Sequence, residues 1–520
     1  MTSPTIEYGL IAPLLVMLCG VLCAVLVEAL VPRTRRFDTQ FGLALLAQLV
    51  ALALVCAGWS DVPGAAVEGS LSVDGPTRVV WAMMLVFGLG ATLLYGERRV
   101  CGGTSSFAAQ AHTVPGSRAE HEAIAARQEN TEVFALLELS LFGMLVFPAA
   151  NDLLTMFVAL EILSLPLYVM CGLARRRRLL SQEAALKYFL LGAMSSALFL
   201  FGAALLYGFC GSFTFADIDA GVTLGIESQT LLMAGLALTT AGVLFKIGAV
   251  PFHSWVPDVY TGAPTPVTAF MAVCTKLAAF GGLLRLLFVA LGGARWDWQL
   301  VIAVIAVCTM IFGGFVGLAQ TDVKRLLAYS SIAHAGFILV AVVGAMAGPA
   351  LAQGRSGSVS GVMFYLAGYG LATMGAFAVL TMVRRSGGEA TGFEAWAGLG
   401  RREPVLGAIM TLFLLSMAGI PMTGGFVGKL VAFSAGWQGG YAWLVVVAVV
   451  MSLVTAAFYF RLVKVMYFDE PDGSVDVVKA GTPTWTVIAV CVRLSLVLHP
   501  VSCSTFSRAQ QDSCADRRRP

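Results

Sequence analysis

The sequence predicts an all-α polytopic membrane protein with about fourteen transmembrane helices. Of its 520 residues, 58% are hydrophobic and only 12% are charged, whereas about 25% of the residues of a soluble domain are charged. Apolar stretches close to the roughly 20 residues that span a bilayer recur along the whole chain. This composition cannot supply a water-facing surface, so we expect the chain to be surrounded by lipid.

The apolar stretches place the helices in order along the chain. The first has no charged leader and no small-residue cleavage site, so we expect a retained helix rather than a signal peptide. The predicted spans are 9–31, 41–58, 78–95, 133–149, 152–173, 182–208, 230–252, 264–291, 299–319, 326–347, 359–383, 405–434, 441–467 and 483–500. The last is the least regular, because Arg493 interrupts its apolar run.

Basic residues test this count, because cytoplasmic loops are enriched in lysine and arginine. Alternate loops carry eighteen basic residues on one side and three on the other. Both termini are therefore predicted to face away from the cytoplasm. We interpret the run Arg175–Arg178 as a topology anchor, in preference to a lipid- or nucleotide-binding patch.

Other features of the composition exclude several kinds of site. The eleven cysteines are scattered and include no CxxC pair, so iron–sulfur, haem and zinc ligation are not expected. The net charge of +3 gives no reason to expect a nucleic acid partner. The polar stretch 97–131 is predicted to be a flexible loop without a catalytic role.

Lysines inside the predicted spans are the main candidates for function. Arginine is the default basic residue here, with 26 copies against 7 lysines. Even so, four lysines fall inside predicted spans: Lys187, Lys246, Lys276 and Lys429. A charge at the bilayer centre costs about 2.5–3.5 kcal/mol on insertion scales. Because lysine can release its proton and arginine cannot, the set indicates proton handling rather than simple helix association.

Three acidic residues also fall in apolar spans. Glu161 is the deepest, and a nearby cation would keep it ionised until that charge is removed, which couples the two groups. Glu138 and Glu28 are equally compatible with a structural role. His334 suits proton relay because of its titration range, although a hydrogen-bonded structural histidine is nearly as consistent with the sequence.

Two spans combine proline, glycine and lysine in the same way. One contains Lys246 and Pro251, and the other contains Pro421 and Lys429. Proline and glycine weaken a helix, and an unwound backbone is tolerated in a membrane only inside protein or beside water. Broken helices at corresponding positions of two halves indicate an inverted repeat with its ion site at the midplane.

The predicted repeat divides the chain into four parts. They are an N-terminal three-helix segment with the polar loop (1–132), a first inverted repeat (133–291, spans 4–8), a second inverted repeat (292–468, spans 9–13) and a divergent C-terminal segment (469–520).

From about Asp152 to Phe468 the sequence resembles the antiporter-like membrane subunits of proton-pumping NADH-quinone oxidoreductase (respiratory complex I), in particular those called subunit N. The specific stretches are Leu160-Glu-Ile-Leu-Ser-Leu-Pro-Leu-Tyr168, Lys246 through Lys276 including Val256-Pro-Asp-Val-Tyr-Thr-Gly-Ala-Pro264, Gln320-Thr-Asp-Val-Lys-Arg-Leu-Leu-Ala-Tyr-Ser-Ser331, and Ala418 through Lys429.

The resemblance implies roles for individual residues and a setting for the chain. Glu161 and Lys246 match the family's charge-coupled input pair, Lys276 and His334 its lateral path, Lys429 its exit lysine and Lys187 its helix-6 lysine. It further implies a bacterial plasma membrane, other complex I membrane subunits as partners in a hetero-oligomer, and no cofactor bound by this chain. NADH, flavin, iron–sulfur clusters and quinone are expected in other subunits.

Two rival functions remain. A subunit of a multi-subunit sodium–proton antiporter shares the fold and the glutamate and lysine chemistry, although Lys429 and the run Gly419-Ile-Pro-Met-Thr-Gly-Gly425 favour subunit N. A multi-pass membrane enzyme such as a lipid-linked glycosyltransferase would require acidic or metal-binding clusters in large external loops, and the external loops here are short.

Overall fold

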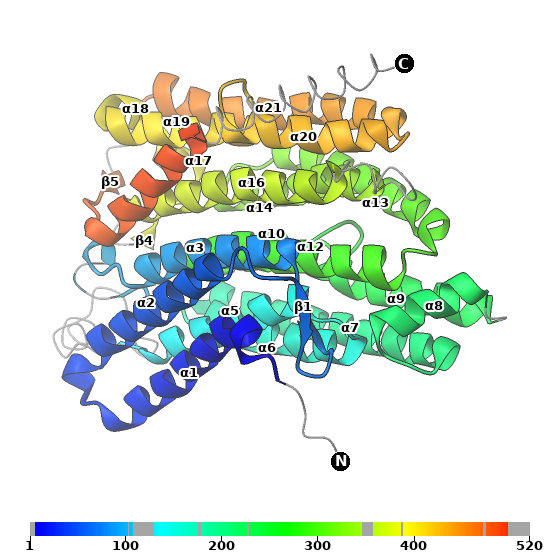
Figure 1. Cartoon of the computed structure of the whole chain (residues 1–520). Coiled ribbons are helices and arrows are strands. Elements are labelled where there is room, and N and C mark those ends of the chain that lie inside the picture. The colour runs from blue at the N-terminus through cyan, green and yellow to red at the C-terminus, as the bar shows by residue number, and fades with distance from the viewer. Residues whose placement is uncertain are drawn as a thin grey trace.

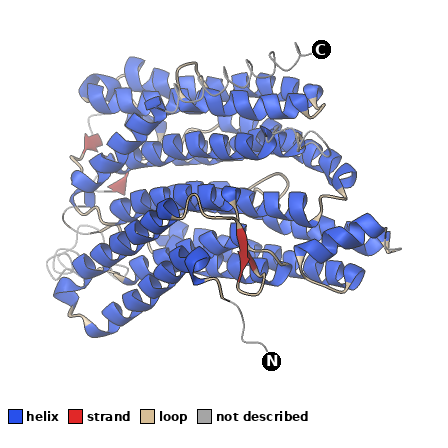
Figure 2. Cartoon of the chain, viewed as in Figure 1, coloured by secondary structure: helices blue, strands red, loops and turns tan. Residues whose placement is uncertain are grey.

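The computed structural model describes residues 6–101, 103, 105–107, 129–174, 178–225, 228–345, 357–385, 388–471 and 475–497. The described chain is almost entirely helical, with two small antiparallel sheets (Figure 2). Twelve helices in these ranges are long and apolar enough to span a membrane. A broken helix and a shorter apolar helix, Thr482–Val497, raise the number of crossings to the predicted fourteen.

The elements follow the predicted order, and their helices lie side by side across the molecule (Figure 1). The N-terminal part contains α1 (Tyr8–Leu30), α2 (Arg33–Ala57), β1 (Gly64–Ala66), β2 (Leu71–Val73), α3 (Gly75–Tyr95) and the 3₁₀ helix η1 (Arg99–Cys101). The first repeat contains α5 (Glu132–Ala149), α6 (Leu153–Cys171), α7 (Arg178–Cys210), α8 (Phe215–Leu224), α9 (Gln229–Ile247), α10 (Trp255–Gly262), α11 (Thr265–Phe270), the π-helical η2 (Met271–Thr275), α12 (Lys276–Arg285) and the π-helical η3 (Leu286–Ala290). The second repeat contains α13 (Arg295–Leu318), α14 (Val323–Val343), α16 (Gly357–Met382), β3 (Val383–Arg385), β4 (Gly388–Glu389), α17 (Phe393–Trp396), α18 (Leu399–Arg402), α19 (Pro404–Ala418), α20 (Gly424–Gln438) and α21 (Ala442–Phe468), and β5 (Val475–Val477) follows it.

Both breaks occur where the sequence predicts them, and both have the same backbone geometry. Gly248 ends α9 with φ +77°, and Gly419 ends α19 with φ +81°. Each glycine N–H bonds back into the last turn, and the next residue, Ala249 or Ile420, donates to the carbonyl five residues earlier. This is the Schellman motif, and its left-handed position favours glycine.

The hydrogen bonds at the start of α6 recur at the start of α14. Leu153 N–H donates to Phe213 O and Phe215 N–H to Asn151 O, while Asp152 caps α6 by accepting from Thr155 N–H. In the second repeat Val323 donates to Thr391 and Phe393 to Thr321, and Asp322 caps α14. The elements beside these two patterns, α8 and β4, lie at opposite ends of the bundle (Figure 1), so the structure supports the predicted inverted relation.

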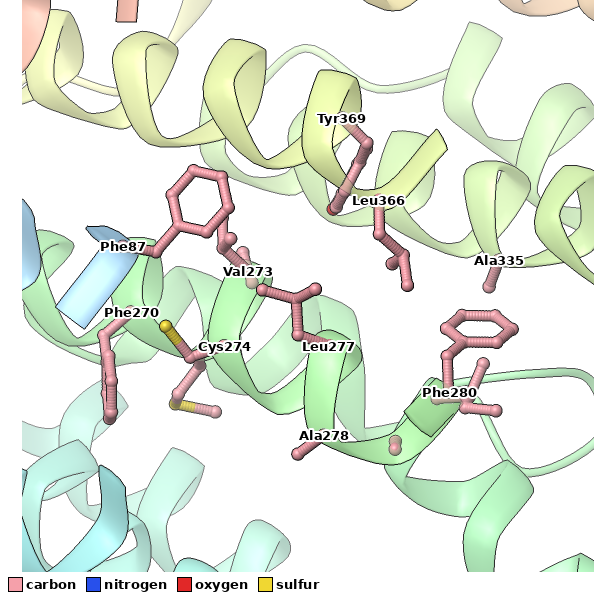
Figure 3. Close-up of a cluster of buried hydrophobic side chains, with 14 of the residues drawn as sticks. Phe87, Phe270, Val273, Cys274, Leu277, Ala278, Phe280, Ala335, Leu366 and Tyr369 are labelled. Atoms are coloured by element: carbon pink, nitrogen blue, oxygen red, sulfur yellow. The ribbon is translucent and has the colours of Figure 1, made fainter. Parts of the chain in front are cut away.

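The core is centred on α14, where every residue except Arg325 is buried. α11, η2 and α12 are buried along their whole length. Figure 3 shows the apolar side chains around η2 and α12, with Tyr369 extending toward them from α16. The most enclosed helices are therefore those that carry Lys276 and His334.

The start of α2 differs from the prediction. α2 starts at Arg33, directly after Pro32, eight residues before the predicted span. The basic residues placed in a loop are therefore helical, because arginine is a good helix former and proline suits a helix start. The last predicted span forms a helix, Thr482–Val497, which continues through Arg493, and this arginine is exposed.

The C-terminal helix is attached to the body by Glu97. This buried carboxylate accepts hydrogen bonds from Gly481 N–H at 2.8 Å and from Thr484 Oγ1 at 2.9 Å. An anion at a helix N-terminus interacts favourably with the helix dipole. The middle of the predicted flexible loop (108–128), Arg175–Arg177 and the tail after Val497 lie outside the described residues.

Candidate functional site

Lys246 lies in the last turn of α9, directly before the first break, and is buried. Its Nζ donates to Tyr168 Oη at 3.2 Å. The rings of Tyr168, Tyr188 and Phe245 surround the ammonium group at 5.4, 5.5 and 5.7 Å from their centroids. Aromatic faces attract a cation at such distances without fixing its proton.

Trp255, at the start of α10, closes this aromatic enclosure. Its ring stacks on Tyr188 at 4.7 Å with planes 13° apart, and its indole N–H donates to Phe245 O at 2.9 Å. The chain after the break is thereby packed against the chain before it, and the enclosure around Lys246 is held in place.

Glu161 lies on α6, two turns before Tyr168. It lies on the same face of α6 as Tyr168, and the described hydrogen bond of Lys246 goes to Tyr168. Glu161 Oε1 is buried and makes no hydrogen bond within the described part of the chain. The predicted input pair is therefore an arrangement of three groups, with a tyrosine hydroxyl in direct contact with the lysine.

Lys276 follows the π-helical segment η2 and is buried. Its Nζ donates to the backbone carbonyl of Ser331, and the Tyr369 ring lies 5.5 Å away. Ser331 is one turn before His334 on α14. The lysine and the histidine are thus neighbours along the core without a described direct contact.

His334 lies between two tyrosines. Its Nδ1 is 2.7 Å from Tyr365 Oη and its Nε2 is 3.1 Å from Tyr459 Oη. Tyr459 also hydrogen-bonds Ser330. A neutral imidazole donates from one nitrogen and accepts at the other, so this arrangement can pass a proton by exchanging tautomers.

Lys429 lies on α20, after the second break, and is buried. Its Nζ donates to Ala418 O at 2.8 Å and to Ser452 Oγ at 2.7 Å, with the Phe337 ring 5.0 Å away. Ala418 ends α19, so the carbonyl freed by the break is the one that binds the lysine. This is how an unwound backbone holds a cation inside a membrane protein.

Lys187 differs from the other three lysines. Its side chain is 41% exposed and pairs with Glu183 and Asp258, both at 2.7 Å. Arg325 lies 3.5 Å from the other oxygen of Asp258. The structure therefore places Lys187 in a partly exposed ion-pair cluster with two carboxylates, whereas the other three lysines are buried and have hydroxyl and carbonyl partners.

Sequence reasoning missed the hydroxyl groups that hydrogen-bond to these residues, on Tyr168, Tyr365, Tyr459 and Ser452, and the Tyr369 ring beside Lys276. Tyr168 could have been found from its spacing to Glu161, since seven residues return to the same face of a helix. The others come from helices far apart in the chain, and their spacing carries no such signal.

Comparison with known proteins identifies the family. The sequence profile described as NADH:quinone oxidoreductase/Mrp antiporter, TM, matches residues 150–455, which is more than half of the chain. The chain belongs to this family. The matched region contains both breaks and all six predicted site residues.

Individual members of the NADH:quinone oxidoreductase/Mrp antiporter family support the assignment. NADH-quinone oxidoreductase subunit N of Cutibacterium acnes is 52% identical over 504 residues, covering 95% of this chain and 93% of that protein. A chain of respiratory complex I from Thermus thermophilus is 32% identical with a TM-score of 0.74, over 94% of this chain and 96% of that one. A chain of the Mrp complex from Dietzia sp. shares the fold at 21% identity and a TM-score of 0.72, over 90% of this chain and 82% of that one.

Proposed function

We propose that this chain is the subunit N of a proton-translocating NADH-quinone oxidoreductase in a bacterial plasma membrane. The observation that carries the proposal is the set of three enclosed lysines, Lys246, Lys276 and Lys429, whose hydrogen-bond partners are hydroxyl and carbonyl oxygens. Such partners stabilise an ammonium group less than a carboxylate ion pair does, so the proton can leave. The relatives named subunit N support the same function.

In this function the chain binds no redox cofactor, and electron transfer from NADH to quinone occurs in other subunits. Lys246 with Glu161 takes up the proton. Lys276 and His334 pass it along the core, and Lys429 releases it on the far side. Lys187, in its exposed ion-pair cluster, supplies charge at the cytoplasmic entrance. The chain works within a hetero-oligomer of complex I membrane subunits.

The alternative is a subunit of a multi-subunit sodium–proton antiporter, which belongs to the same family. The solved Mrp chain supports only the fold, because its identity is 21%. Ion flux through liposomes that hold only this chain would favour the antiporter function. We expect no such flux, because in the proposed function redox chemistry elsewhere supplies the energy.

The deciding experiment measures NADH-driven proton pumping in membranes that carry Lys246→Ala or Lys246→Arg, normalised to assembled complex. Arginine keeps the charge but cannot release the proton. We expect both variants to lose pumping while the complex still assembles. Full pumping with Lys246→Arg would show that this residue is only a fixed charge, and the relay would then be wrong at its central residue.

A further inference from the structure

Glu138 is a buried acid that the proposed proton path does not use. It lies on α5, is 1% exposed, and faces α2 and α3 through Gln48 and Thr92, both of which are 0% exposed. On α5, Ser140 instead donates to Leu163 O of α6, 2.8 Å away. Glu138 therefore points away from the helix that carries Glu161.

Glu138 has fewer hydrogen-bond donors around it than an ionised carboxylate requires. Gln48 Nε2 donates one hydrogen to Glu138 Oε1 and the other to Thr92 Oγ1, and the Thr92 hydroxyl donates to Gly88 O at 3.0 Å. All the donors of this cluster are thereby used. Glu138 Oε2 and Gln48 Oε1 remain buried without a hydrogen-bond partner in the described part of the chain.

Glu28 on α1 provides an internal comparison, because it has the partners that an ionised carboxylate requires. Arg36 Nη1 donates to it at 2.8 Å, Gln40 Nε2 at 3.0 Å, and Thr131 Oγ1 bonds both oxygens at 2.8 and 2.9 Å. A buried carboxylate without a cation costs several kcal/mol. Among the described contacts, Glu138 has a single donor and no cation.

Two closely packed glycines lie beside the unpartnered oxygens: a Cβ on Gly20 would lie 2.8 Å from Ala47 Cβ, and one on Gly88 would lie 2.7 Å from Leu141 Cδ2. A Cβ on Gly20 of α1 would lie 3.8 Å from Glu138 Oε2, and a Cβ on Gly88 of α3 would lie 3.4 Å from Gln48 Oε1. One proton on Glu138 removes the buried charge and turns an unpartnered acceptor into a donor for a neighbouring oxygen.

We propose that Glu138 is a proton-binding site, which holds a proton as a neutral carboxylic acid throughout turnover. The bound proton stabilises the contact of α2 and α3 with α5, and thus of the N-terminal helices with the first repeat. It is separate from the proton that the lysines carry, so the proposal does not depend on the proposed function.

The experiment compares the assembled wild-type complex with Glu138→Gln, and uses Glu28→Gln as the matched control. Infrared spectra are recorded with ¹³C-labelled glutamate, in which a protonated carboxyl group and a carboxylate absorb at separate frequencies. We expect Glu138→Gln to remove a protonated-carboxyl band and Glu28→Gln to remove carboxylate bands. Loss of carboxylate bands in Glu138→Gln would overturn the proposal.

Assembly and pumping supply the second readout. Glutamine is the neutral isostere of the acid, so we expect Glu138→Gln to assemble and to pump protons at the wild-type rate. Glu138→Ala should lower the yield of complex, because Gln48 then loses its acceptor. Failure of Glu138→Gln to assemble would show that the carboxylate charge is needed, and reduced pumping in the assembled variant would show that the proton is translocated. Either result contradicts the proposal, and neither bears on the role of Lys246.

Discussion

The two breaks of the inverted repeat share a backbone and differ in chemistry. At the first break Lys246 precedes the glycine, is enclosed by three aromatic rings and has one hydroxyl partner. At the second break Lys429 follows the glycine and is held by a freed carbonyl and a serine. The position two residues before each glycine holds Lys246 in one repeat and the buried Met417 in the other.

The two repeats therefore share the backbone geometry that interrupts the helix, but they differ in the position of the titratable lysine. A lysine before the break contacts the side chains that pack on α9, whereas a lysine after the break can reach the carbonyl that α19 leaves free. The two lysines are therefore suited to different steps. The following substitutions test this difference.

The largest effect is expected at the start of α14, where the second repeat has a buried ion pair that the first lacks. Lys324 Nζ lies 2.9 Å from Glu389 Oε2 and 2.9 Å from Ala263 O, and the residue at the matching position of α6 is Leu154. Glu389→Gln should destabilise the complex by roughly 3–5 kcal/mol, because the Lys324 charge stays buried. Thermal unfolding of the purified complex measures this, with Leu154→Gln as the control of small expected effect.

The same pair predicts a pH dependence. Burial opposes ionisation of Glu389, but the charges of Lys324 and Arg384 outweigh it and lower its pKa from 4.5 to about 2. Because the pKa is lower in the folded state, the stabilisation is present above about pH 4.5 and is lost as the pH falls toward 2. Wild type and Glu389→Gln should therefore converge in stability across this range. A constant difference between them would contradict the assignment.

Replacing Lys429 tests whether the lysines at the two breaks have different roles in proton transfer. Lys429→Met replaces the lysine by methionine, an apolar residue type that the second break already contains at Met417. We expect pumping to fall by roughly 100-fold, the scale of a lost proton-transfer group, with assembly intact. Met417→Leu is the matched control, which should pump normally. Equal losses in both variants would mean that packing at the break, rather than the lysine, is what matters.

Replacing Gly248 and Gly419 by alanine separates the effect of backbone conformation from the effect of nearby side-chain contacts. Each substitution should cost about 1–2 kcal/mol of stability, because φ is positive at both sites. A Cβ at Gly419 would lie 2.8 Å from Lys429 Cδ, whereas one at Gly248 would lie 2.8 Å from Val256 Cγ2. We therefore expect similar thermal destabilisation but a larger pumping defect for Gly419→Ala. The reverse order would indicate that the first break controls the rate.

The hydroxyl partners are expected to affect pumping less than the lysines themselves. Tyr168→Phe removes the described hydrogen-bond partner of Lys246, while Ser452→Ala leaves Lys429 bonded to Ala418 O. A hydrogen bond to a charged group contributes about 1.5–3 kcal/mol, so Tyr168→Phe should slow pumping by roughly tenfold or more. Ser452→Ala should have a weaker effect. Pumping rates per assembled complex test the ranking, and a stronger effect of Ser452→Ala would refute it.

The sequence by itself predicted the number of membrane crossings and the two breaks. It also singled out the candidate site residues Lys246, Lys276, Lys429, Glu161 and His334. These are local properties, since hydropathy over 20 residues and the effects of proline and glycine act within one helix. The division into four parts and the roles of the site residues remain predictions.

Only the tertiary structure decided which groups these residues contact and how enclosed they are. Tyr365 and Tyr459 reach His334 from α16 and α21, and Ser452 reaches Lys429 from α21. Lys187 also lies inside a predicted apolar span, yet its side chain pairs with Asp258 of α10 as well as with the neighbouring Glu183, in a partly exposed cluster. Helix packing sets these contacts through rotation and depth, which the order of residues along one helix does not specify.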